Sequence, residues 1–187
     1  MGKADYIERE ELLHVLALLT PENRLAMEIS LATGLRISDV LALRSAQLAP
    51  RMRVTEAKTK KVRSVRLPAE LLRRAQLLAH HGSEWVFPHR LDPAKHRTRQ
   101  AVWCDLQRAA HAVRLPAAMQ CSPHSARKGA AVALYRRSGD LDKVRKFLAH
   151  DRPETTLIYA MADALTARRL GQKGGRYKAP KCNKSLQ

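Results

Sequence analysis

Apolar residues recur at intervals of three and four along most of this chain, which places them on one face of an α-helix. Prolines at first helical positions and glycines after last ones divide this pattern into successive helices. We expect helices over residues 8–19, 21–33, 38–43, 69–81, 98–113, 124–137 and 140–149, another opened by Pro153, and a short one over 164–170.

The stretch from Met52 to Leu67 follows a different pattern. Val54 precedes a polar, basic run over residues 58–61, and alternating apolar residues such as Val65 come after it. This pattern predicts two short strands joined by a basic turn, and residues 85–87 predict a further extended piece. The expected fold class is therefore mostly α with a small antiparallel β-sheet (α+β).

The charge balance indicates a polyanionic partner. Lys and Arg number 35 against 17 Asp and Glu, so the formal net charge is +18. Nucleic acid is favoured over an anionic membrane surface, because no segment approaches the ~20 apolar residues of a spanning helix. The length of 187 residues fits one domain, which we expect over residues 1–170, followed by a basic, flexible tail over 171–187.

Other features of the sequence indicate neither export nor a metal site. Residues 1–11 are charged and lack the apolar core of a signal peptide, so we expect a cytoplasmic protein. The cysteines are odd in number and widely spaced, which is typical of reduced thiols, at Cys104, Cys121 and Cys182. Four histidines lie close together in the sequence, but their spacing matches no familiar metal site, so we interpret them as solvated: His80, His81, His89 and His96. No metal or other cofactor is expected.

Three segments carry residues suited to phosphodiester chemistry. The first reads Thr33-Gly-Leu-Arg-Ile-Ser-Asp and contains Arg36; the second reads Pro123-His-Ser-Ala-Arg-Lys; the third runs from Leu148 to Tyr159. Any one of these motifs is weak, because arginines between helices are common in basic proteins. Together they contain two arginines, a histidine three residues before the second arginine, another histidine, and a tyrosine nine residues after that. This ordered set resembles the tyrosine recombinase (phage integrase) family. The resemblance runs from about Tyr6 to Met161.

The resemblance implies the catalytic-domain fold of that family and a specific role for each residue. Tyr159 would attack the DNA backbone and form a 3′-phosphotyrosine, while the guanidinium groups of Arg36 and Arg127 would grip the scissile phosphate and offset its developing charge. Nearby cations, including His124, His150 and the arginines, would favour the phenolate of the tyrosine. Taken singly, each residue also has an ordinary alternative, as a surface charge, a packed tyrosine or a helix-capping histidine.

The remaining roles concern protons. His124 would assist proton transfer from Tyr159, and His150 would hydrogen-bond a phosphate oxygen. By resemblance, a lysine in the turn between the two strands protonates the leaving 5′ oxygen. We choose Lys58, counting back from the end of the second strand, although Lys60 and Lys61 are close enough that a change of register would select one of them.

The sequence departs from the family pattern in three ways. Ala149 stands where the family often has glycine, and Lys128 and Gly129 follow Arg127 in place of the frequent histidine and threonine. The third departure is that the catalytic motif begins by Thr33, so we expect no N-terminal clamp domain, as in a naturally minimal recombinase or a fragment of a longer protein. The substitutions remove no catalytic group, but they affect packing around His150 and Arg127.

The resemblance also implies partners. The expected partner is double-stranded DNA, and the protein is expected to be a monomer when free and a tetramer on synapsed DNA. It would act in a prokaryotic cell and be encoded by a phage or mobile element. Residues 164–170 could dock on a neighbouring protomer. The rival interpretations are a type IB topoisomerase, which uses similar chemistry, and a non-catalytic DNA-binding protein with a helix-turn-helix around residues 140–150. The short spacing from His150 to Tyr159 favours a recombinase, and a binding protein leaves the ordered motifs unexplained.

Overall fold

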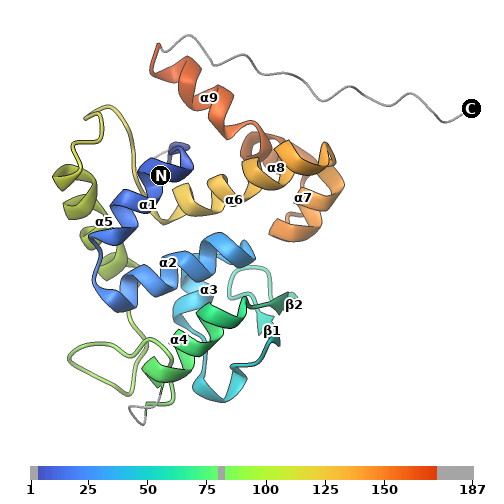
Figure 1. Cartoon of the computed structure of the whole chain (residues 1–187). Helices are drawn as coiled ribbons and strands as arrows, with labels where there is room; N and C mark the ends of the chain where they lie inside the picture. The colour runs from blue at the N-terminus through green and yellow to red at the C-terminus, as the bar shows by residue number, and fades with distance from the viewer. Residues whose placement is uncertain (1–3, 80–82, 172–187) are drawn as a thin grey trace, which may run out of the picture.

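The computed structural model of the protein describes residues 4–79 and 83–171 (Figure 1). Within these residues the fold is mostly helical with one antiparallel pair of strands, which confirms the predicted fold class. The elements are, in chain order, α1 (Arg9–Ala17), α2 (Pro21–Thr33), α3 (Ile37–Leu41), the 3₁₀ helix η1 (Ser45–Gln47), β1 (Arg51–Thr55), β2 (Val62–Arg66), α4 (Ala69–Ala79), α5 (Arg99–Ala112), α6 (Pro123–Ser138), α7 (Leu141–Leu148), α8 (Pro153–Ala160) and α9 (Ala162–Arg169).

Most helices begin and end where the sequence predicts. The side chains of Thr98 and Asp140 accept hydrogen bonds from the first backbone N–H groups of α5 and α7, since those groups have no partner inside the helix. Gly34 and Gly139 end α2 and α6 in the left-handed conformation, with φ of 66° and 64°. Gly34 also faces a tight space, because a Cβ there would lie 2.6 Å from Cε1 of Phe147.

The starts of α3 and α6 and the cap of α2 differ from prediction. The helix predicted to be capped by Ser38 begins at Ile37, so Arg36 occupies its N-cap position. The helix predicted from His124 begins one residue earlier, because Ser122 caps it and Pro123 fits its first turn. Thr20 precedes α2 as predicted, but its side chain does not cap that helix. Its backbone N and its hydroxyl donate to Asp105 of α5 instead.

The two predicted strands form a hairpin. Arg51 pairs with Arg66 at its base and Thr55 with Val62 near its tip, and the side chains of Met52 and Val65 are buried against the core. The extended piece predicted at residues 85–87 contributes an isolated bridge between Arg44 and Trp85, not a third strand. The basic turn therefore projects from a hairpin that has one face packed against the core.

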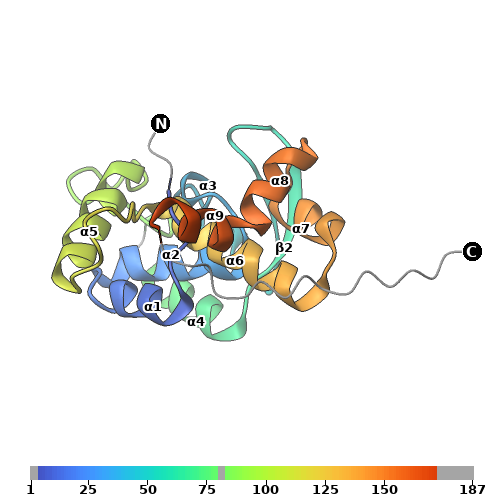
Figure 2. The same ribbon diagram turned by 90° about the horizontal axis from the view of Figure 1, so that it is seen from above.

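The helices α2 and α6 pack against each other at the centre of the molecule, with α1, α4 and α5 around them (Figures 1 and 2). Buried side chains of α1, α2, α3, the hairpin, α5 and the start of α6 share one continuous hydrophobic core. A smaller cluster of Ala131, Val144 and Leu148 joins α6 to α7. The core thus fixes α2 and α6, whose ends carry the candidate site.

The last helix packs on its own chain. α9 overlaps the short helix predicted over residues 164–170, and the hydroxyl of Thr166 accepts a hydrogen bond of 2.9 Å from the backbone N of Tyr6. Arg169 donates from Nε to the buried carboxylate of Asp5 at 3.0 Å. These contacts join the first and last described segments. The docking of this helix on a neighbouring protomer stays a prediction. The predicted basic tail after Gly171, which includes Cys182, lies outside the described residues.

Two further predictions concern the cysteines and membrane-spanning segments. Cys104 is exposed and Cys121 is buried, and both are free thiols, as predicted. None of the helices that the structure describes is both long and apolar enough to cross a membrane.

Candidate active site

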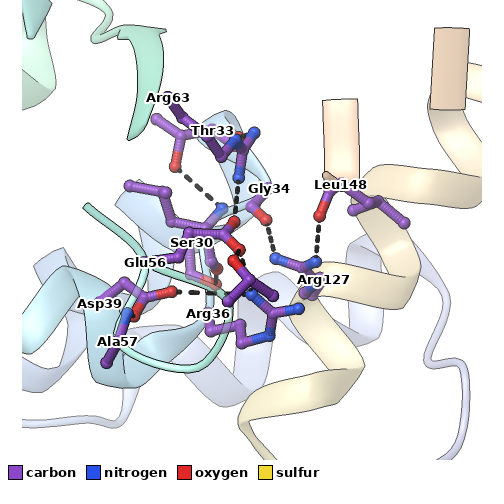
Figure 3. A network of polar contacts seen from close by, with 12 residues as sticks. Ser30, Thr33, Gly34, Arg36, Asp39, Glu56, Ala57, Arg63, Arg127 and Leu148 are labelled. Carbon is purple, nitrogen blue, oxygen red and sulfur yellow. Dashed lines mark hydrogen bonds and ion pairs between the residues drawn. The ribbon is translucent and has the colours of Figure 1, made fainter. Parts of the chain in front are cut away.

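Three segments that are distant in the sequence meet around the side chain of Arg127 (Figure 3). Arg127 comes from the first turns of α6 and is 1% exposed. Its guanidinium donates to the carbonyl of Gly34, at the end of α2, and from the other terminal nitrogen to the carbonyl of Leu148, at the end of α7, at 2.5 Å. Both carbonyls lie at helix C-termini, where a positive charge is favoured. Arg127 therefore joins the loop that bears Arg36 to the loop that bears His150.

Burial and the neighbouring Arg36 lower the pKa of Arg127 to about 10, which still leaves the group charged at neutral pH. A guanidinium has five N–H donors, and the two carbonyls use one on each terminal nitrogen. Further donors remain for an anion, so the observed contacts are compatible with a phosphate-binding role that the sequence predicts.

Arg36 lies beside this centre at the N-terminus of α3. Its side chain is 18% exposed and donates from Nη1 to the carboxylate of Glu56 at 2.6 Å. The same nitrogen lies 4.0 Å from Oδ2 of Asp39, one helical turn along α3. Because one edge of the guanidinium is occupied by acids, its other nitrogens are the ones that could contact a phosphate.

Tyr159 lies on α8 within reach of both predicted histidines. Its hydroxyl is 3.2 Å from Nδ1 of His124, at the start of α6. Its ring meets the ring of His150 edge to face, with centroids 5.0 Å apart, and Nδ1 of His150 lies 3.4 Å from the hydroxyl of Thr156. The ammonium of Lys128 lies 5.8 Å from the centroid of the Tyr159 ring, within the range of a cation–π contact. The candidate nucleophile is thus surrounded by residues of the second and third motifs.

The electrostatics of these groups differ in one respect from the sequence-based prediction. Burial lowers the pKa of His150 to about 4, and burial together with Arg127 lowers the pKa of His124, so both imidazoles are neutral at pH 7. Burial raises the pKa of Tyr159 against the opposing effect of Arg127 and Arg36. The histidines do not act as cations here, contrary to our expectation, and the resting tyrosine is protonated. Neutral His124 is instead a proton acceptor within hydrogen-bond distance of the phenol.

The candidate lysine, Lys58, lies on the exposed turn of the β1–β2 hairpin. Of its two competitors, Lys61 forms an ion pair with Asp151 in the α7–α8 connection, and Lys60 has a positive φ of 58°. The ion pair brings the turn beside the segment that follows His150. Lys58 remains our choice, since Lys61 is paired with an acid.

Several residues of the site were not predicted from the sequence. Glu56 and Asp39 are buried acids that contact Arg36, and Arg63 donates to Glu56 and to the backbone carbonyl of Phe147. Lys128 donates to the carbonyl of Ala4 at 2.6 Å, in addition to its place beside Tyr159. Asp39 could have been inferred, since it follows Arg36 by three residues on a helix. No local pattern marks Glu56 or Arg63, because their partners are distant in the sequence.

Comparison with known proteins agrees with this geometry. The family model described as "Phage integrase family" matches residues 6–165. The chain belongs to the phage integrase family. Among curated proteins, the tyrosine recombinase XerD of Bradyrhizobium diazoefficiens is 32% identical over 148 residues, covering 71% of this chain and 46% of that protein. This chain therefore spans about half the length of the curated relatives it matches.

Solved structures of the family share the fold. The XerH site-specific recombinase bound to palindromic difH substrate, in a post-cleavage complex, superposes with a TM-score of 0.70 at 20% identity, covering 91% of this chain and 53% of that one. The catalytic domain of bacteriophage HP1 integrase gives a TM-score of 0.60 at 22% identity, covering 89% of this chain and 95% of that domain. The predicted catalytic-domain fold of the tyrosine recombinases is thereby confirmed.

The histidine cluster considered in the sequence lies away from this site. His80 and His81 fall outside the described residues; His96 packs edge to face on Trp85, and Nδ1 of His89 accepts a hydrogen bond from the backbone N of Leu91. Among residues 4–79 and 83–171, no three His, Cys, Asp or Glu side chains are grouped so as to hold a metal ion.

Proposed function

We propose that this protein is a site-specific DNA recombinase that cleaves and rejoins DNA strands through a 3′-phosphotyrosine at Tyr159. The observation that carries the proposal is the distance of 3.2 Å between the Tyr159 hydroxyl and Nδ1 of His124, three residues before the buried Arg127. A nucleophile and a base within hydrogen-bond distance of each other are the expected arrangement for covalent catalysis. Membership of the phage integrase family supports the same reaction.

In the first step, the phenol oxygen attacks the scissile phosphorus and passes its proton to neutral His124. A bond forms between the Tyr159 oxygen and phosphorus, and the bond between phosphorus and the 5′ oxygen breaks. The guanidinium groups of Arg36 and Arg127 offset the charge that develops on the nonbridging oxygens. His150 lies against the Tyr159 ring and donates a hydrogen bond to one of those oxygens.

The leaving 5′ oxygen takes a proton from Lys58, which gives a free 5′-hydroxyl. Religation reverses these steps with a 5′-hydroxyl from another strand as the nucleophile. Because the phosphotyrosine conserves the energy of the phosphodiester bond, the reaction requires neither ATP nor a metal ion.

We further propose that the substrate is double-stranded DNA and that four protomers act on two synapsed sites, whereas the free protein is a monomer. A net charge of +18 supports binding to a polyanion. The outcome would be integration, excision or inversion of DNA in the cytoplasm of a prokaryotic cell, since the relatives named above come from a bacterium and a bacteriophage.

Covalent trapping tests the proposal. The protein is incubated with a suicide DNA from its native locus, in which a nick just 3′ of the cleavage site lets the short fragment with the freed 5′-hydroxyl diffuse away. Adducts are then separated under denaturing conditions. We expect an adduct with the wild-type protein and with Tyr135→Phe, and none with Tyr159→Phe. Tyr135 is a matched control, because it lies on α6 beside the cluster of Ala131, Val144 and Leu148.

An adduct that survives in Tyr159→Phe, or no adduct on locus DNA that the protein demonstrably binds, would contradict the proposed nucleophile. A strand-exchange assay on two labelled DNA sites then distinguishes the recombinase from a topoisomerase. Recombinant strands are expected for the first, and relaxation of supercoils without exchange for the second.

A further inference from the structure

Glu56 has a completely buried carboxylate at the edge of the candidate site, and the proposed chemistry does not use it. Its Oε2 accepts hydrogen bonds from Arg36 at 2.6 Å and from the hydroxyl of Thr59 at 2.7 Å. Its Oε1 accepts a hydrogen bond of 3.2 Å from Arg63. One carboxylate therefore joins the phosphate-gripping arginine, the second strand of the hairpin and the turn of the hairpin. Figure 3 shows Glu56 with Arg36 and Arg63.

The backbone of Glu56 also closes the turn. Its N–H donates to the carbonyl of Lys61, and its carbonyl accepts from the N–H of Lys60, both at 2.9 Å. With Lys60 in the left-handed region, these two hydrogen bonds close a four-residue hairpin loop over residues 57–60. Lys58 is the second residue of that loop.

A second buried acid holds the other side of the turn. Oδ1 of Asp39 accepts a hydrogen bond of 2.9 Å from the backbone N of Ala57, the residue before Lys58. The turn is thus bonded through Ala57 to Asp39 and through Thr59 to Glu56, and both acids lie next to Arg36. Lys58 itself is exposed between these two attachments.

A short exposed turn is mobile unless contacts with the rest of the protein restrict it. Loop tips are among the most mobile parts of a protein, whereas a proton donor must stay near the oxygen that it protonates. Two hydrogen bonds from a buried network restrict the turn at the residues on either side of the lysine. Burial of an acid beside arginines is poor evidence for stabilisation of the fold, so its role in placing other groups is the simpler account.

We propose that Glu56 is a positioning residue: through the hydroxyl of Thr59 and the guanidinium of Arg36, it fixes the turn that presents Lys58 relative to the arginine that grips the phosphate. The inference rests on the proposed function, because it assigns Glu56 to the protonation of the leaving 5′ oxygen. Of the three side chains that donate to the Glu56 carboxylate, Thr59 is the one that belongs to the turn.

Thr59→Val is the most informative variant. Valine keeps the shape of threonine but cannot donate to Glu56, while the contacts of Glu56 with Arg36 and Arg63 stay in place. Thr59→Ser retains the hydroxyl and is the matched control. Glu56→Gln is measured alongside and is expected to be slower on every substrate, because it also disturbs Arg36.

The experiment compares two suicide DNAs from the native locus, one ordinary and one with sulfur in place of the scissile 5′ oxygen. A thiolate, whose conjugate acid has a pKa near ~8.5, leaves without being protonated, whereas an alkoxide does not. A defect confined to the proton donor therefore disappears on the sulfur substrate, and a defect in folding or phosphate binding persists.

We expect Thr59→Val to cleave ordinary DNA about tenfold more slowly than wild type, as for the loss of one positioning hydrogen bond. On the sulfur substrate its rate should return to within about twofold of wild type, and Lys58→Ala should behave likewise with a larger initial defect. Thr59→Ser should match wild type on both DNAs.

The inference is overturned if Thr59→Val cleaves ordinary DNA at the wild-type rate, or if it is slowed equally on both substrates. It is also overturned if Lys58→Ala is slowed equally on both, since Lys58 is then not the donor. An active wild-type protein with any of these results leaves the proposed function standing. Absence of cleavage by the wild type on both DNAs would instead contradict the proposed function itself.

Discussion

Tyr159 and the two histidines beside it illustrate how burial changes the chemistry of a motif. Burial raises the pKa of the phenol and lowers those of His124 and His150, so the resting site holds a protonated phenol next to neutral imidazoles. The positive charge of the site then comes from its arginines and from Lys128, and not from the histidines. A neutral imidazole accepts a proton, so attack and proton transfer to His124 are expected to occur together.

The lowered pKa of His150 predicts a dependence of stability on pH. Its pKa is about 4 in the folded protein and 6.5 as an ordinary histidine, so between these values the unfolded chain binds more protons. The stabilisation is complete above pH 6.5 and is lost as the pH falls toward 4. Urea denaturation at pH 7.5 and 5.0 should show that wild type loses about 1 kcal/mol more than His150→Gln, after allowance for partial exposure. Equal losses in both proteins would contradict the prediction.

At the scale of elements, the ends of the helices determine where the side chains of the candidate site point. Ala149 ends α7 in the left-handed conformation with φ 50° and ψ 46°, immediately before His150. Gly34 ends α2 in the same conformation, two residues before Arg36. Arg127 binds the carbonyl of Gly34 itself and the carbonyl of Leu148, the residue before Ala149. The left-handed conformation of Ala149 thus explains why the family often has glycine at that position.

Ala149→Gly should therefore stabilise the protein by about 1 kcal/mol, because a residue with a Cβ is strained in the left-handed region. The same substitution at the exposed Ala133, inside α6, should destabilise it by about 1 kcal/mol, since glycine is a poor helix former. Urea or thermal denaturation of the two variants measures the difference. Two changes of the same sign would show that the conformation of Ala149 is not strained.

At the scale of the whole molecule, the ends of the described chain are fastened together beside the candidate site. Asp5 binds Arg169 of α9 and the backbone of Gln120, just before α6. The carbonyl of Ala4 accepts a hydrogen bond from Lys128, whose ammonium faces Tyr159. The N-terminal segment thus supports both α6 and the last helix.

The net charge of +18 predicts that DNA binding is governed by salt. Contacts with several phosphates release counterions, so affinity for a labelled duplex should fall by at least about 100-fold between 50 and 200 mM salt. Fluorescence anisotropy titrations at four salt concentrations give the slope of log K against log salt. A duplex affinity that is unchanged across this range would argue against phosphate contacts as the main source of binding.

The sequence by itself determined the order and type of the elements and the residues of the three motifs. Helical spacing, capping residues and the alternation around Val54 and Val65 are local signals, so the bounds of α2, the place of the hairpin and the start of α8 were predicted as the structure has them. Only the tertiary structure decided the burial of Glu56, the bonds of Arg127 to the carbonyls of Gly34 and Leu148, and the neutral state of the histidines. Burial and charge at these groups depend on neighbours contributed by segments far apart in the chain, and no local pattern records which segments will meet.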